Sequence, residues 1–191
     1  MFRLTAPSED EVRRFISEQR LSDFSYPVVG ASLTAVPTGY NVDHNRVQLG
    51  RGEKMWHRAV EGIRSWQMFN IPWVRLHWTT APILVGSDVG VLIRHFGFYS
   101  LNVCRIVYVI DEEDPMKRFG FAYGTLAEHG ESGEERFTVE LNQKDEVWYD
   151  ILAFSRPRQM LAKVGYPLSR FLQKRFAEAS KAAMLKAVNR E

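Results

Sequence analysis

The sequence predicts an α+β fold in which a strongly bent antiparallel sheet of about six to seven strands wraps around a long C-terminal helix. Three observations lead to this prediction. Segments rich in Val, Ile and aromatic residues fill the middle of the chain, amphipathic helical segments flank them, and the strand segments are joined by short connections. Such connections cannot hold the crossover helices of a parallel sheet, so we expect an antiparallel meander.

The bulk composition is that of one globular domain. The chain has 191 residues, of which 45% are hydrophobic and 25% are charged. Cys104 is the only cysteine, so an intrachain disulfide or a Cys-based zinc site is excluded and a reducing cytoplasm fits best. No apolar run is long enough for a transmembrane segment. The net charge of +2 gives no reason to expect a nucleic-acid partner.

The N-terminal part is predicted to be a helix followed by a loop. Ser8 to Glu11 form a capping-box pattern, which predicts a short helix from about Ser8 to Arg20. The segment from Leu21 to Tyr40 is punctuated by Pro and Gly, which favours a connecting loop with at most one short edge strand. We therefore divide the chain into an N-terminal appendage, residues 1–39, and a single main domain, residues 40–191.

The main domain is predicted to begin with a strand, Asn41 to Leu49, and a helix, Glu53 to Phe69, whose apolar residues recur at steps of three and four. Six further strands are predicted at Trp73 to Trp78, Val89 to Phe96, Leu101 to Ile110, Phe119 to Leu126, Glu134 to Leu141 and Glu146 to Phe154.

The last helical region is predicted to follow Pro157. Ser155 is interpreted as its N-cap, with Pro157 in the first turn. Apolar residues then recur at helical spacing on both sides of a break at Gly165-Tyr166-Pro167: Met160, Leu161, Val164, Leu168, Phe171, Leu172 and Phe176.

The hairpin from Phe119 to Leu141 is the most informative segment. Because strand side chains alternate, its first strand presents large residues on one face and Gly120, Ala122 and Gly124 on the other. Glycines in a strand permit a bend or the close approach of another group, and we favour the bend.

Three charged residues are predicted to point inward, because each shares a strand face with apolar neighbours: Arg105, Glu135 and Asp150. Buried charges need partners, so the preferred interpretation is a structural bridge between Arg105 and one of the carboxylates. The alternative is a polar site in a cavity, where a carboxylate with a raised pKa, assisted by Tyr123, acts as an acid or base or anchors a ligand head.

Other motifs give little chemistry. His129 with Glu131, Glu134 and Glu135 matches no metal motif, so we expect a solvated or locally hydrogen-bonded histidine and neither a metal nor a cofactor. No motif for a nucleophile or a phosphate loop occurs, and Cys104 is expected to be an inert buried thiol.

Charge is unevenly distributed along the chain. Residues 111–150 hold 12 acids and 4 bases, whereas residues 156–191 hold 9 bases and 2 acids. A solvated helix face near an acidic hairpin is the preferred interpretation, with an anion-binding patch as the alternative.

The strings FGFAYGTLAEHGESGEERF and VWYDILAFSRP resemble a family called domain of unknown function nineteen-ninety. LGRGEKMWHRAVEGIRSWQMFNIPWV and GYPLSRFLQKRF resemble the same family, so the resemblance covers roughly Gly39 to Val188. It implies no established activity. The element order is similar to the START and Bet v 1 helix-grip superfamily, whose members bind lipids, steroids or polyketides and sometimes catalyse cyclisation, which implies an apolar-ligand pocket.

Three functional hypotheses follow, and whether the protein is an enzyme stays open, as does its oligomeric state. The first is a carrier or sensor of a small apolar ligand, with a pocket between the sheet and the terminal helix. The second is an acid–base enzyme that uses Glu135 or Asp150 with Tyr123. The third is a protein or anion interaction module that uses the basic C-terminal helix. The candidate ligand-binding residues are Arg105, Tyr123, Glu135, Phe137, Trp148, Asp150 and Phe171.

Overall fold

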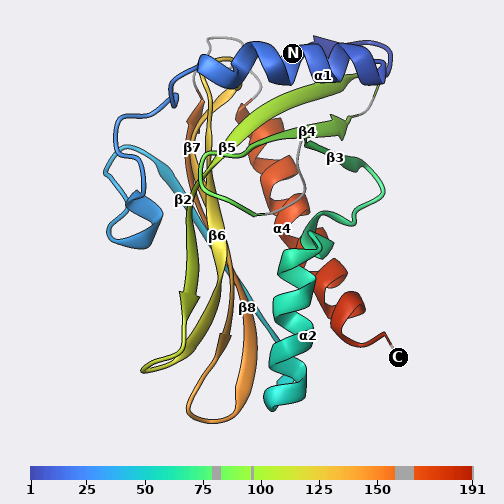
Figure 1. Ribbon diagram of the computed structural model, residues 1–191. Coiled ribbons are helices and arrows are strands. Elements are labelled where there is room, and N and C mark those ends of the chain that lie inside the picture. The colour runs from blue at the N-terminus through green and yellow to red at the C-terminus, as the bar shows by residue number, and fades with distance from the viewer. Residues whose placement is uncertain (79–82, 96, 158–165, 191) are drawn as a thin grey trace.

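The computed structural model describes residues 1–78, 83–95, 97–157 and 166–190. They form an antiparallel sheet that curls around helices on one of its faces (Figure 1), which confirms the predicted fold class. The main elements are β1 (Phe2–Arg3), α1 (Glu9–Glu18), β2 (Asn41–Arg51), α2 (Glu53–Arg64), β3 (Val74–Trp78), β4 (Asp88–Arg94), β5 (Tyr99–Glu112), β6 (Lys117–Thr125), β7 (Glu131–Leu141), β8 (Glu146–Pro157) and α4 (Tyr166–Val188), with short 3₁₀ turns η1 (Gln19–Leu21), η2 (Ala31–Leu33) and η3 (Gln67–Phe69).

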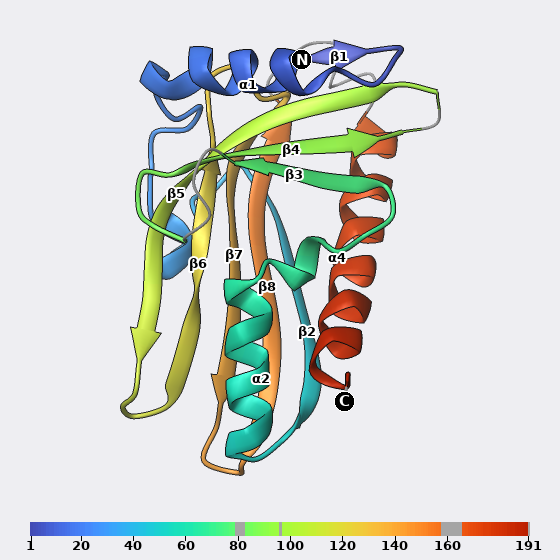
Figure 2. The ribbon, with the colours of Figure 1, turned by 45° about the vertical axis from the view of Figure 1, so that its right-hand side comes forward.

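The eight described strands form one sheet in the order β2-β8-β7-β6-β5-β4-β3, and β1 pairs with β5. Every pairing is antiparallel, as the short connections predicted. Helices α2 and α4 lie against one face of the sheet (Figure 2). We call this the inner face, and the opposite one the outer face.

The main hydrophobic core lies between the inner face and the two helices. Phe121 and Phe137, on β6 and β7, are fully buried, and Trp56 and Ile63 of α2 belong to the same cluster, as does Met184 of α4. Fully burying a side chain of this size stabilises the fold by about 1.5–3 kcal/mol. The apolar stripe of α2 therefore acts as predicted.

Helix α1 covers part of the outer face. Its N-terminus has the predicted capping box, with the Ser8 hydroxyl accepting a hydrogen bond from the Glu11 N–H. Val12 and Ile16 pack in a second cluster with Leu101 and Val103, which point outward from β5. The sheet is thus buried on both faces at this end, and the domain boundary at residue 40 stays a prediction.

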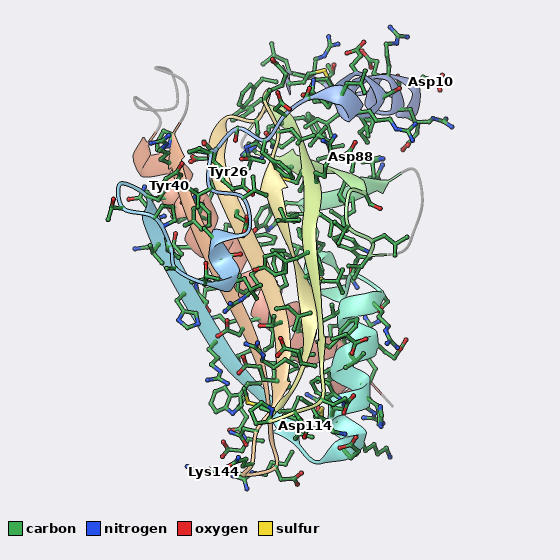
Figure 3. The ribbon with its side chains drawn as sticks, turned by 60° about the vertical axis from the view of Figure 1, so that its left-hand side comes forward. Asp10, Tyr26, Tyr40, Asp88, Asp114 and Lys144 are labelled. Carbon is green, nitrogen blue, oxygen red and sulfur yellow. The ribbon has the colours of Figure 1, made fainter. Side chains whose placement is uncertain are left out.

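The segment between α1 and β2 is bound to the outer face through Glu134. The carboxylate of this buried residue accepts hydrogen bonds from the Tyr26 hydroxyl at 2.7 Å, the Gly30 N–H at 2.8 Å, and the N–H and hydroxyl of Ser32. Figure 3 labels Tyr26, which belongs to this segment. A Cβ on Gly124 would lie 2.1 Å from the Tyr26 hydroxyl oxygen, so this glycine permits a close approach.

Two predicted boundaries were wrong. Helix α2 ends at Arg64 instead of Phe69, because Trp66 adopts a left-handed conformation (φ 57°) and its ring packs 4.8 Å from the ring of Phe121. Ser155 is not a helix cap, because β8 continues to Pro157, which pairs with Glu131 of β7.

The predicted helical residues Met160, Leu161 and Val164 lie outside the described residues. In the part of the chain that is described, no helix is long and apolar enough to cross a membrane.

Candidate functional site

A cavity of about 570 Å³ lies between the inner face and α4. This volume is within the range of small-molecule sites, about 300–1,000 Å³. The sheet contributes to its lining Asp43, Asn45, Val91, Ile93, Cys104, Tyr123, Glu135, Ile151 and Ala153, and the helical side contributes Phe69, Trp73, Leu172, Gln173, Phe176 and Ala177. Most of the exposed wall surface is apolar, and further polar residues, among them His95, Asn102, His129 and Glu131, also line the cavity.

Polar contacts fix the first turns of α4 at one side of the cavity. The guanidinium of Arg170 makes a two-pronged ion pair with Asp43 of β2, with Nη2 and Oδ1 2.5 Å apart. Gln173 donates to the Ser155 hydroxyl of β8 at 2.8 Å. Since Leu172 and Phe176 are one helical turn apart, both reach the cavity from the face of α4 that these contacts hold toward the sheet.

Tyr123 and Glu135 form the central polar pair of the cavity. They lie directly opposite each other on β6 and β7, and the Tyr123 hydroxyl donates to Glu135 Oε2 at 2.8 Å. The side chain of Glu135 is half-buried, and it lines the cavity.

The environment of Glu135 favours its protonated form. Burial raises the pKa of Glu135 to about 7, and Asp43 adds to the rise, while the hydrogen bond from Tyr123 opposes it. Burial also raises the pKa of Tyr123 well above its ordinary value. Near neutral pH the Glu135 carboxyl is thus present in both protonation states, so it can either accept or donate a proton.

The histidines of the cavity are neutral at pH 7. Burial lowers the pKa of His95, whose Nε2 lies 2.7 Å from the Ser100 hydroxyl. Burial lowers the pKa of His129 to about 4. As expected, His129 is hydrogen-bonded locally, and because its Nδ1 accepts the Glu131 N–H at 3.0 Å, the ring carries its proton on Nε2.

The predicted bridge between Arg105 and Glu135 was wrong. Arg105 lies on the outer face, where its Nε is 2.7 Å from Asp88 Oδ1 and its Nη1 and Nη2 donate to the carbonyls of Ser22 and Arg20. Arg105 therefore fastens the end of the α1 region to the sheet. It does not line the cavity.

The prediction that Asp150 points inward was also wrong. It is buried on the outer face, with Oδ2 2.6 Å from His44 Nε2 and Oδ1 3.3 Å from Arg136 Nη2. Alternation along a strand separates two faces, but it does not say which of them faces the cavity when both are covered. The outer covering by the N-terminal segment is the physical reason for both errors.

The three aromatic candidates do not line the cavity either. Phe137 is fully buried in the core behind it, Trp148 lies under the guanidinium of Arg46 at 4.8 Å, and Phe171 is 53% exposed. The sequence missed Phe69 and Phe176 as lining residues. The spacing of Phe176 from Leu172 in the predicted helix could have indicated it, whereas no sequence signal placed Phe69 there.

A curled antiparallel sheet with a long C-terminal helix across its inner face is the Bet v 1-like, helix-grip architecture. Solved structures agree on the fold. A hypothetical protein from Helicobacter pylori superposes with a TM-score of 0.56 at 11% identity, covering 88% of this chain and 98% of that one. A norcoclaurine synthase point mutant from Thalictrum, in complex with a transition-state analogue, gives 0.50 at 16% identity, covering 80% and 96%.

The chain belongs to the family described as Domain of unknown function (DUF1990), whose family model matches residues 25–183. A relative in Dictyostelium discoideum named UPF0548 protein is 35% identical over 207 residues, covering 98% of this chain and 96% of the relative. A UPF0548 protein of Deinococcus radiodurans is 36% identical and covers 93% of both chains. The family resemblance inferred from the sequence is confirmed.

Proposed function

We propose that the protein binds a small apolar or amphipathic molecule in the cavity between the sheet and α4. The observation that carries the proposal is the cavity itself, about 570 Å³ with mainly aromatic and aliphatic walls. Protein interiors are ordinarily packed without voids much larger than a water molecule, so a space of this size is not needed for folding. Its volume suits a molecule of one to a few rings.

The test compares two variants that differ only in where a large side chain is added. Ala153 lines the cavity from β8, whereas Ala182 is exposed on α4. We expect native mass spectrometry and solvent extraction to find an apolar ligand on the wild type and on Ala182→Trp, and not on Ala153→Trp. A neutral naphthalene probe should follow the same pattern in a fluorescence titration.

The proposal fails if the wild-type protein carries no ligand and also fails to bind a series of neutral ring compounds, lipids and sterols at millimolar concentration. Equal binding by wild type and Ala153→Trp would place the ligand elsewhere.

A second candidate is an acid–base enzyme that uses Glu135 with Tyr123. The observation that favours it is the raised pKa of Glu135, about 7, in direct contact with a hydroxyl donor inside the cavity. Asp150, the other candidate base, has no place in this scheme because it lies on the outer face. Incubating the protein with its extracted ligand in D₂O gives the test: deuterium uptake that requires Glu135 supports catalysis, and no uptake speaks against it.

The interaction-module hypothesis has less support. Arg170 binds Asp43, Lys181 binds Glu178, and Arg175 lies 4.7 Å over the ring of Trp73, so several cations of α4 are used within the chain. A cytoplasmic location stays a prediction that rests on the single cysteine, Cys104.

A further inference from the structure

We propose that the ligand carries a protonated amine that pairs with the carboxylate of Glu135, so that the cavity selects organic cations over carboxylate-bearing molecules such as fatty acids. This inference rests on the proposed function, because it names the chemical class of the molecule that the cavity binds.

The first argument is the charge of the lining. The acids whose carboxylates belong to the lining are Asp43, Glu131 and Glu135, since the carboxylate of Glu134 turns to the outer side, and the described lining residues include no Lys or Arg. The two histidines do not compensate, because burial lowers the pKa of His95 and of His129 and leaves both neutral at pH 7. A bound anion would therefore meet like charge, which is more unfavourable between mainly apolar walls than in bulk water.

The second argument is that the other central carboxylates already have partners. Arg170 neutralises Asp43. Glu134 turns its carboxylate to the outer side, where Tyr26, Gly30 and Ser32 donate to it. Among the described ion pairs none includes Glu135, and its one described hydrogen bond comes from Tyr123 to Oε2. Oε1 of Glu135 is thus left to accept a hydrogen bond from a ligand group.

The third argument is the chemistry around Glu135. A carboxylate removed from water without a cation is costly, and an ammonium group from the ligand would supply the missing charge. The ring of Tyr123 lies 6.1 Å from that of Phe69, which lies 5.4 Å from that of Phe176, and all three line the cavity. Aromatic faces also attract cations, by about 0.5–2 kcal/mol.

Proton linkage gives the inference a pH dependence. Four titratable groups interact electrostatically with Glu135: Tyr123 of β6, Cys104 of β5, Asp43 of β2 and Tyr149 of β8. Burial raises the pKa of the two tyrosines and of the thiol, so these three stay neutral below pH 8. On the side of α4 the cavity is lined by Gln173 and Phe176, which do not titrate.

An amine binds the ionised form of Glu135, whose fraction rises as the pH passes its pKa of about 7. The affinity for the amine should therefore increase about tenfold from pH 6 to pH 8.

The experiment uses three probes that share one ring system: naphthylethylamine, naphthylethanol and naphthylacetate. Calorimetric titrations are run on the wild type, on Glu135→Gln and on the outer-face control Glu140→Gln, whose native carboxylate pairs with Arg46. We expect the wild type and Glu140→Gln to bind the amine at least about tenfold more tightly than the alcohol at pH 8, and to bind the acetate most weakly. Glu135→Gln should lose this preference and its pH dependence while it still binds the alcohol, which also shows that the variant is folded.

Three results would overturn the inference. Equal affinity for the three probes in the wild type would show that no ion pair forms with Glu135. A preference for the amine that persists in Glu135→Gln would show the same, and both results leave the proposed function intact. If the wild type binds none of the three probes, the inference fails, whereas the proposed function fails only if solvent extraction also finds no ligand and no neutral ring compound, lipid or sterol binds.

Discussion

Two neighbouring glutamates show how strand geometry gives the same side chain two roles. Glu134 and Glu135 are consecutive on β7, so their side chains leave the strand on opposite faces. Among the described residues, Glu134 accepts four hydrogen bonds and binds the N-terminal segment, whereas Glu135 accepts one and faces the cavity. The first carboxylate contributes to the fold, and the second has the environment of a functional group.

Glu135 should make the protein less stable as the pH rises. Its pKa is about 7 in the folded protein against 4.5 ordinarily, so between these values the folded state binds more protons than the unfolded chain and the free energy of unfolding falls with pH. Replacing it by Gln removes this effect. We expect the stability of Glu135→Gln relative to wild type to increase by about 3 kcal/mol from pH 4 to pH 8, measured by urea unfolding.

The matched control is Glu61→Gln, which removes an exposed carboxylate paired with Arg64 on the surface of α2. Surface pairs of this kind contribute about 0–1 kcal/mol, so the control should follow the wild type across the pH range. A constant difference between Glu135→Gln and wild type would show that the carboxyl group is not perturbed.

Gly124 should not tolerate a side chain. In Gly124→Ala the new Cβ would lie 2.1 Å from the hydroxyl oxygen of Tyr26, so the Tyr26 ring must move and its hydrogen bond to Glu134 is weakened. We expect a loss of about 1–3 kcal/mol in thermal or urea unfolding. Gly130→Ala is the control, because its Cβ would be 4.0 Å from the nearest atom, on Phe2. Equal stability of the two variants would contradict the packing described for Tyr26.

At the scale of elements, local signals predicted the structure well and long-range contacts could not be predicted. The capping box at Ser8 depends on residues three positions apart, and the strand faces depend on alternation, so both were readable in the sequence. The partners of Arg105 in the α1 region lie 83 to 86 residues away along the chain. No local sequence pattern indicates such a contact, so the Arg105 side chain was assigned to the wrong face of the sheet.

Arg105 should hold the α1 region against β5. Arg105→Met removes the donors to three carbonyls and leaves Asp88 without its partner. We expect a loss of roughly 2–4 kcal/mol in stability. Relative to the wild type, amide hydrogen exchange should accelerate more in α1 than in β7. Arg3→Met, which breaks an exposed pair with Glu11, should change stability by less than about 1 kcal/mol. Unchanged exchange in α1 of Arg105→Met would show that the helix is held by its apolar contacts alone.

At the scale of the whole molecule, the cavity follows from a long curled sheet whose inner face is only partly filled by α2 and α4. The aromatic residues of the chain contribute to a bulky core and also to the walls of the cavity. Phe121 and Phe137 fill the core, whereas Phe69 and Phe176 line the open space. Its volume depends on how far the sheet bends, which is a property of the complete fold and is not encoded in any one segment.

The most direct test of ligand binding in the cavity is an NMR titration of the methyl-labelled protein with naphthylethanol. Val91, Ile93 and Ile151 line the cavity, whereas Leu101 and Val103 pack against α1 on the outer face. We expect intermolecular contacts from the probe to the first three methyl-bearing residues and none to the other two. Contacts confined to the outer-face pair, or no contacts at saturating probe, would contradict binding between the sheet and α4.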